Sequence, residues 1–180
     1  LAVALSPYAW AGRDRSLHEH VFAATLLGAT IVSLPLLLAW KRPGRRLTRY
    51  AIAVAQMLYS ALLIHLTGGR IETHFHIFGS LAFLAFYRDY KVLLPATIVV
   101  AGDHLVRQRG GPESVYGIAN PEAWRFLEHA SWVAFEDVFL VLSCLTATRE
   151  MRATALQHAE VEALSDRARD KSIALDKALE

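Results

Sequence analysis

Long apolar runs separated by short polar stretches fill the chain as far as residue 147. Three runs are long enough to cross a bilayer as helices, since about 20 residues at 1.5 Å each span its hydrocarbon layer. Two further runs are shorter, and the tight polar turn at 88–91 between them predicts a helical hairpin. The five predicted membrane helices are Val21–Trp40, Tyr50–Leu66, Phe75–Tyr87, Val92–Val106 and Trp124–Thr146.

A polar helix is predicted to follow at 148–180. It continues the fifth membrane helix without Pro or Gly, and a weak heptad-like stripe runs along it. We expect a cytoplasmic coiled-coil linker that pairs two copies of the chain in parallel and leads to an output domain; the alternative is a solvated helix without a partner. The stripe consists of Val161, Leu164, Ala168, Lys171, Leu175 and Ala178.

The predicted fold class is therefore all-α, an integral membrane bundle of about five transmembrane helices at 1–147 that continues into the linker at 148–180. A soluble protein with one buried helix pair would leave too much apolar surface uncovered. The composition agrees, with 54% hydrophobic and 20% charged residues. The chain begins without Met and ends within a helical pattern, so we expect a segment of a longer protein. Its single cysteine, Cys144, excludes an intrachain disulfide.

Basic residues crowd the loop at 41–49 and recur at Arg88 and Lys91. By the positive-inside rule these loops face the cytoplasm, which places the N-terminus outside and the tail inside a bacterial inner membrane. Arg107 and Arg109 oppose this orientation but are outnumbered. The net charge of +2 does not indicate a nucleic-acid partner, because the basic residues lie beside apolar runs.

Seven of the eight histidines map to the predicted outer edge of the membrane, where chance would divide them between both edges. Several carboxylates accompany them. Imidazoles and carboxylates together are typical of a metal site, since a cation offsets the cost of gathering these groups near hydrocarbon. The seven histidines are His18, His20, His65, His74, His76, His104 and His129.

The predicted metal ligands are His20, His65, His74, His76, His104 and His129. Glu72, Asp103 and Glu128 are predicted to support these ligands or to replace some of them. Zinc or copper suits imidazole ligands without a thiolate, and iron is favoured if the carboxylates bind directly. Haem b between two facing histidines is the alternative cofactor. Interfacial side chains bonded to backbone or water are the alternative without a cofactor.

Glu136 and Asp137 lie about a dozen residues into the fifth membrane helix. Carboxylates at that depth are costly and indicate function. Glu136 follows His129 by seven residues, so both lie on nearly the same helical face. We predict that Glu136 and Asp137 relay a change at the site toward the tail; the alternative is a hydrogen bond that fixes helix packing.

The run IHLTGGRIETHFHIFGSLAFLAFYRDYKVLLPATIVVAGDHL, followed by SVYG and EHASWVAFEDVFL, resembles the N-terminal membrane module of a group of bacterial sensor histidine kinases. The resemblance covers about residues 16 to 150 and implies sensing and signal transmission, with cytoplasmic output domains after the linker. It does not imply a particular ligand. The matching residues are His65, Gly68, Gly69, Arg70, Glu72, His74, His76, Arg88, Asp89, Asp103, His104, Glu128, His129, Glu136 and Asp137.

The favoured function is therefore a sensory input domain that is not itself an enzyme. A membrane-embedded, hydrolase-like metalloenzyme with Glu72 or Glu128 as its base is the second interpretation. A purely structural role in helix packing and dimerisation is the third.

Overall fold

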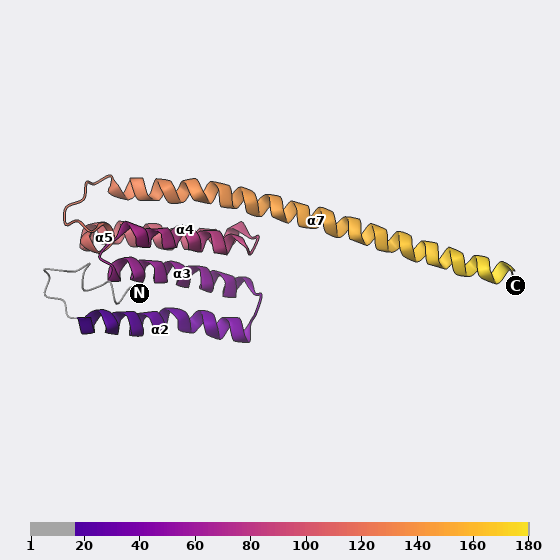
Figure 1. Cartoon of the computed structure of the whole chain (residues 1–180), viewed down its shortest axis with the longest axis horizontal. Helices are drawn as coiled ribbons and strands as arrows, with labels where there is room; N and C mark the ends of the chain where they lie inside the picture. The colour runs from indigo at the N-terminus through magenta and orange to yellow at the C-terminus, as the bar shows by residue number, and fades with distance from the viewer. Residues whose placement is uncertain (1–16, 180) are drawn as a thin grey trace.

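The computed structural model describes residues 17–179, a part of the chain that contains helices and no strand. Five long helices lie side by side, and the last runs far beyond the others (Figure 1). The predicted all-α fold is confirmed for these residues. The helices are α2 (Leu17–Lys41), α3 (Arg46–Leu66), α4 (Ile71–Ala85), α5 (Leu93–Gly110), α6 (Glu113–Tyr116) and α7 (Arg125–Leu179), with a 3-10 turn η1 at Tyr90–Val92.

Three helices are long and apolar enough to cross a membrane, namely α2 from Glu19 onward, α3 and α7. The helices α4 and α5 have 15 and 18 residues, which makes them about 22 and 27 Å long at 1.5 Å per residue. The hydrocarbon layer is about 30 Å thick. Sufficient length and apolar character to cross a membrane are thus confirmed for three of the five predicted helices.

The helix α3 is the centre of the bundle and packs against α2, α4 and α5. Met57 and Ile64 of α3 are fully buried, and Leu81 of α4 and Leu93 of α5 pack into the same core. Val133 is the buried residue that α7 adds to this core. A shared core of α3, α4, α5 and α7 fixes the rotation of each helix and so decides which side chains meet.

The end of the bundle from which the tail emerges is tied together by loop contacts. The Arg49 guanidinium lies 3.9 Å from the Asp89 carboxylate and 5.5 Å from the centre of the Tyr87 ring. Thr148 at the start of the tail donates a hydrogen bond of 2.9 Å to the carbonyl of Arg88. The root of the tail is therefore anchored to the α4–η1 loop.

The opposite end is closed by a backbone contact between two loops. The turn between α3 and α4 contains Gly69, whose backbone lies directly against residues 115–117. The Arg107 side chain donates to the Ser114 carbonyl and pairs with Asp103 one turn earlier in α5. These contacts hold the short helix α6 over this end of α5.

Candidate metal centre

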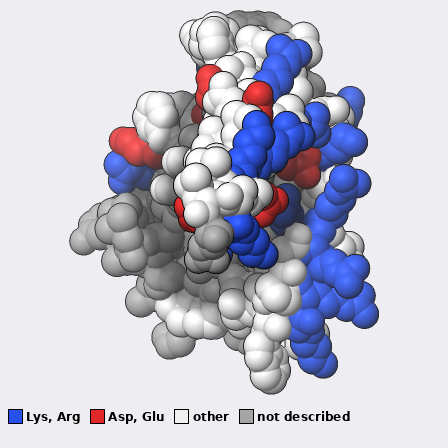
Figure 2. Space-filling view, turned by 90° about the vertical axis from the view of Figure 1, so that its right-hand side faces the viewer, with Lys and Arg blue, Asp and Glu red and all other residues white. Residues whose placement is uncertain are grey.

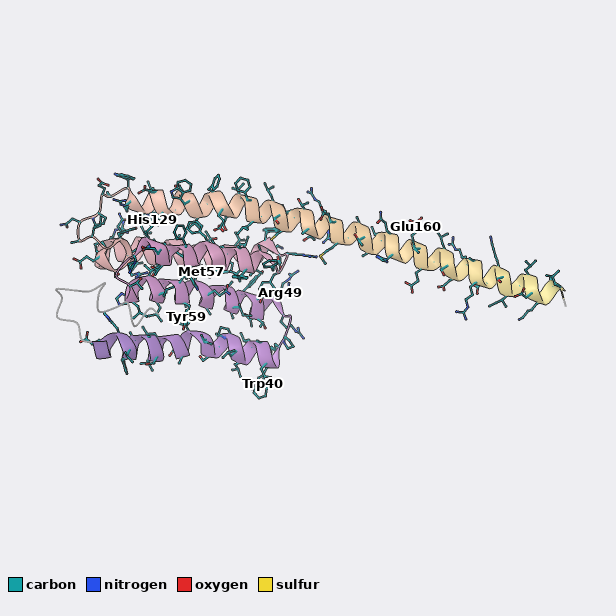
Figure 3. All side chains as sticks on the ribbon, viewed as in Figure 1. Trp40, Arg49, Met57, Tyr59, His129 and Glu160 are labelled. Carbon is teal, nitrogen blue, oxygen red and sulfur yellow. The ribbon has the colours of Figure 1, made fainter. Side chains whose placement is uncertain are left out.

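Three of the predicted ligands, His74 of α4, His104 of α5 and His129 of α7, form a triangle at this closed end. Their ring centres are separated by 5.6 Å (His74–His104), 5.4 Å (His74–His129) and 5.8 Å (His104–His129). His129 lies near the start of α7 (Figure 3). Residues up to 55 positions apart in the sequence are thus brought to one point, which we call the histidine triad.

Each ring of the triad is held in the same way by its own helix. The Nδ1 atom of His74 lies 2.9 Å from the Arg70 carbonyl, and those of His104 and His129 lie 3.1 Å from the carbonyls four residues before them. A carbonyl only accepts hydrogen bonds, so Nδ1 must carry the proton in all three rings. The lone pair of every ring is therefore on Nε2, the arrangement that metal-binding histidines adopt.

Burial leaves one ring of the triad, that of His74, with an unpartnered nitrogen. His74 and His104 are only 5% and 4% exposed. The Nε2 atom of His74 is buried and has no hydrogen-bond partner among the described residues. A buried nitrogen lone pair without a donor costs about 1–3 kcal/mol. A metal ion at the centre of the triad would satisfy it.

The spacing of the rings suits one shared ion. A Zn–N bond is about 2.0–2.1 Å, so imidazoles that share a tetrahedral ion have ring centres about 5 Å apart. The observed separations are slightly longer. Within residues 17–179, no group of three or more His, Cys, Asp or Glu side chains could hold a metal ion in the arrangement observed. Binding of one shared ion would therefore require the three rings to move closer together.

A pocket of about 280 Å³ lies beside the triad and is lined by all three histidines. Most of its remaining wall is apolar, with Ile77, Val100 and Val133 among the lining residues. Three protein ligands leave a coordination position open on a tetrahedral ion. The pocket offers space for a ligand at that position.

Tyr116 of α6 covers the triad from the loop side. Its ring centre is 5.0 Å from that of His129 and 6.2 Å from that of His104, and its hydroxyl donates to the Gln108 side chain. Burial raises the pKa of the Tyr116 phenol above its usual value, an effect that the positive charge of Arg107 opposes. Tyr116 thus stays protonated at neutral pH. The sequence analysis did not identify Tyr116 as a candidate site residue. The SVYG run at 114–117, part of the family resemblance, was the one sequence feature that contained it.

The predicted supporting carboxylates are paired with arginines. The Asp103 carboxylate pairs with Arg107 and also lies 3.5 Å from Nδ1 of His104. Glu128 lines the pocket and lies 3.4 Å from Arg125. Glu72 pairs with Arg70 in an exposed position, 3.1 Å away. Asp103 and Glu128 thus lie beside the triad.

The other predicted ligands occupy separate places. His20 and His65 contact each other, with ring centres 6.4 Å apart. His76 hydrogen-bonds to serines of α3 and α4. The side chain of His18 lies outside the described residues. The structure therefore brings together His74, His104 and His129 and places His20, His65 and His76 in other contacts.

Of the two predicted relay residues, Asp137 bonds across the bundle. Thr97 of α5 donates a hydrogen bond of 2.5 Å to its carboxylate, and Thr97 also lines the pocket beside the triad. One carboxylate oxygen each of Glu136 and Asp137 is buried without a hydrogen-bond partner among the described residues. The Thr97–Asp137 bond therefore joins the pocket wall to the helix that becomes the tail.

We expect Thr97→Val to weaken the packing of α5 against α7. The substitution preserves shape but removes the donor to Asp137, which costs about 1–3 kcal/mol when a buried acceptor loses its partner. Unfolding by sodium dodecyl sulfate, followed by circular dichroism, measures the loss. Thr30→Val is the matched control, because the Thr30 hydroxyl bonds only to the Leu26 carbonyl of its own helix. Equal losses in the two variants would contradict a cross-helix role.

Comparisons of the chain with models of protein families, with curated protein sequences and with solved structures give no match. The class of this protein is therefore described from its fold and its histidine site alone. In its described residues the protein is an all-helical chain with three helices long and apolar enough to cross a membrane. At one end it holds a cluster of three histidines, of which His74 and His104 are buried and His129 is half-buried.

Proposed function

We propose that the chain is the membrane input domain of a bacterial signalling protein, in which a transition metal binds the histidine triad. One observation carries the proposal. Imidazoles on three helices, two of them buried and that of His129 half-buried, all commit Nδ1 to a backbone carbonyl, and one of those helices, α7, continues unbroken for 50 residues beyond its histidine. An ion at the triad would therefore act directly on the helix that leaves the bundle.

The proposal includes five membrane-crossing helices. Large apolar side chains point away from the bundle on both short helices, as with Phe83 of α4 and Ile98 of α5, which are 67% and 70% exposed. In water such surfaces would be unfavourable, whereas lipid covers them. Both helices also lie alongside apolar spans of sufficient length (Figure 1). A local thinning of the bilayer accommodates the shorter α4 at modest cost.

The tail is proposed to lie in the cytoplasm and the triad near the outer face of the inner membrane. Lys and Arg side chains form a band beside the point where the tail emerges (Figure 2). Lys41, Arg42, Arg45 and Arg46, in and beside the α2–α3 loop, are exposed there. Clustered basic residues at this end support a cytoplasmic placement.

Transmission is proposed to occur through α7 in a homodimer. The tail residues from 149 onward are exposed, including the apolar Val161, Leu164 and Leu175. Two tails paired in parallel would cover this stripe. An ion that draws His129 toward α4 and α5 would shift α7 and favour one tail register, which requires a coupling free energy of about 1–3 kcal/mol. Output domains after the tail would respond to the change in tail register.

The first experiment is metal analysis of the purified chain by elemental mass spectrometry and ultraviolet-visible spectroscopy. We expect about one equivalent of zinc, copper or non-haem iron per chain. An intense Soret band would instead indicate haem b. A folded chain without any metal, before and after incubation with Zn²⁺, Cu⁺ and Fe²⁺, would contradict the proposal.

The second experiment follows the tail in lipid nanodiscs. The experiment uses the substitution Ala168→Cys in a Cys144→Ser background. On metal addition we expect the rate of disulfide cross-linking between tails to change by about 5-fold or more. His129→Ala should abolish the change. Glu136→Gln should reduce it without loss of metal if the predicted relay operates; an unchanged response would contradict the relay.

A metalloenzyme is the alternative, and one observation favours it. Glu128 lines the same pocket as the triad, so a carboxylate lies next to the proposed open coordination position. Its pairing with Arg125 reduces its availability as a base. Turnover of a lipid or amide substrate by the purified chain, lost with chelator and in Glu128→Gln, would establish this alternative.

A further inference from the structure

The paired histidines of the THFH run serve two different sites. His74 and His76 are two residues apart, which turns them about 200° from each other around α4. His74 lies in the triad, whereas His76 lines a separate crevice of about 470 Å³ between α2, α3 and α4. Its Nδ1 atom lies 2.8 Å from the Ser60 hydroxyl and 3.3 Å from the Ser80 hydroxyl. The ring is therefore fixed in orientation at the crevice wall.

The crevice combines polar groups with aromatic surface. The side-chain oxygen of Gln56 is buried and has no hydrogen-bond partner among the described residues. Tyr59 lines the crevice from between α3 and α2, where its ring packs beside Gly28 (Figure 3). Phe83 of α4 forms part of the same wall. Gln56 and His76 thus present hydrogen-bonding groups next to two aromatic rings.

The position of the crevice restricts what can enter it. From the helix ends near the triad, its residues lie about 8 to 22 Å along the bundle at 1.5 Å per residue. In a membrane this is the hydrocarbon region. His76, Tyr59 and Phe83 are exposed on the outer surface of the bundle, so the crevice opens sideways. A ligand would therefore arrive dissolved in lipid.

The lining selects among lipid-soluble molecules. An acyl chain would leave the Gln56 oxygen without a partner, at a cost in free energy. A charged headgroup would find no residue of opposite charge in the wall, since the lining contains neither Lys nor Arg and neither Asp nor Glu. An uncharged ring with hydroxyl groups could stack on Tyr59 or Phe83 and donate a hydrogen bond to the Gln56 oxygen.

We propose that this crevice binds the head group of a membrane quinol, the reduced form of an isoprenoid quinone. One hydroxyl donates to the side-chain oxygen of Gln56, the ring lies against Tyr59 and Phe83, and His76 bonds to an oxygen of the head group. The isoprenoid tail leaves through the lateral opening into the bilayer. The proposal rests on the membrane placement of α2, α3 and α4 and not on the presence of a metal.

The test uses the complete chain in nanodiscs that contain decylubiquinol under anaerobic conditions. Native mass spectrometry counts bound quinol and bound metal in the same spectrum. We expect one saturable quinol per chain. His76→Leu and Gln56→Leu should each weaken quinol binding about 10-fold or more, because a hydrogen bond is lost in an apolar site, while leaving metal content unchanged. His74→Leu is the matched control on the same helix and should lose metal but retain quinol.

Three outcomes would overturn the proposal. The first is binding by the wild-type chain no greater than by empty nanodiscs. The second is wild-type affinity in both His76→Leu and Gln56→Leu when their unchanged metal content shows that they are folded. The third is equal affinity for oxidised decylubiquinone, which has no hydroxyl to donate to Gln56. Because metal is counted separately, loss of the quinol site and loss of the metal site are distinguishable.

Discussion

His74→Ala, His104→Ala and His129→Ala are each expected to lower the affinity for Zn²⁺ by more than about 100-fold. Loss of a group that only supports a ligand already costs 10- to 100-fold, so loss of a direct ligand should cost more. The proton on Nδ1 leaves only Nε2 of each ring to coordinate. Competition with a chromophoric chelator at constant pH measures the affinity.

His76→Ala is the control for the triad variants. It removes the same side chain two residues from His74 on the same helix, but at the separate crevice between α2, α3 and α4. We expect its Zn²⁺ affinity to stay within about 3-fold of the wild-type value, since none of the three ligands is changed. Circular dichroism checks that all variants fold. Equal affinity losses in His74→Ala and His76→Ala would contradict the triad as the site.

Gly69→Ala is expected to destabilise the closed end of the bundle by at least about 3 kcal/mol, in the range of severe core substitutions. A Cβ atom at Gly69 would lie 2.6 and 2.7 Å from the carbonyl carbon and oxygen of Val115, and still closer to the Gly117 nitrogen. All of these are backbone atoms, which cannot move aside as the end of a side chain can. The φ angle of +75° adds strain for any residue with a Cβ.

Gly44→Ala separates the two effects in Gly69→Ala. Gly44 has a similar φ of +73°, but a Cβ there would meet nothing within 4 Å. Its expected cost is about 1–2 kcal/mol, from the backbone conformation alone. Unfolding in sodium dodecyl sulfate compares the two variants. Equal stability losses would mean that the contact of Gly69 with residues 115–117 contributes nothing.

Gly69→Ala should also weaken metal binding. The contact that it disrupts holds the segment that carries Tyr116 over His104 and His129. We expect a reduced Zn²⁺ affinity and a faster release of Zn²⁺, measured by stopped flow with excess chelator. Unchanged release in a folded Gly69→Ala protein would show that Tyr116 does not cover the site.

The apolar pattern was sufficient to predict the helices. Lipid and the bundle core both require apolar residues over many turns, so the runs in the sequence report the helices directly. The continuous helix through the tail followed from the absence of Pro and Gly, and α7 has no break at residue 148. The predicted first and last residues of the helices were less accurate than the predicted helices themselves. Helix α4 begins at Ile71 and not at Phe75, because residues 71–74, three of which are polar, form its first turn.

The sequence also placed the histidines at one end of the bundle, because their distance from the helix ends can be counted along the chain. It could not select His74, His104 and His129. That choice depends on how each helix is rotated, and the rotation is set by the shared core around Met57, Leu81 and other buried residues.

The sequence by itself thus determined the long helices, their order along the chain and the position of each histidine along its helix, since these follow from local composition and helical rise. It predicted His74 and His76 as ligands of one metal site. Only the tertiary structure decided that His74 meets His104 and His129 while His76 faces the crevice, and that Tyr116 covers the triad. Those contacts join residues far apart in the chain, and packing between helices brings them together.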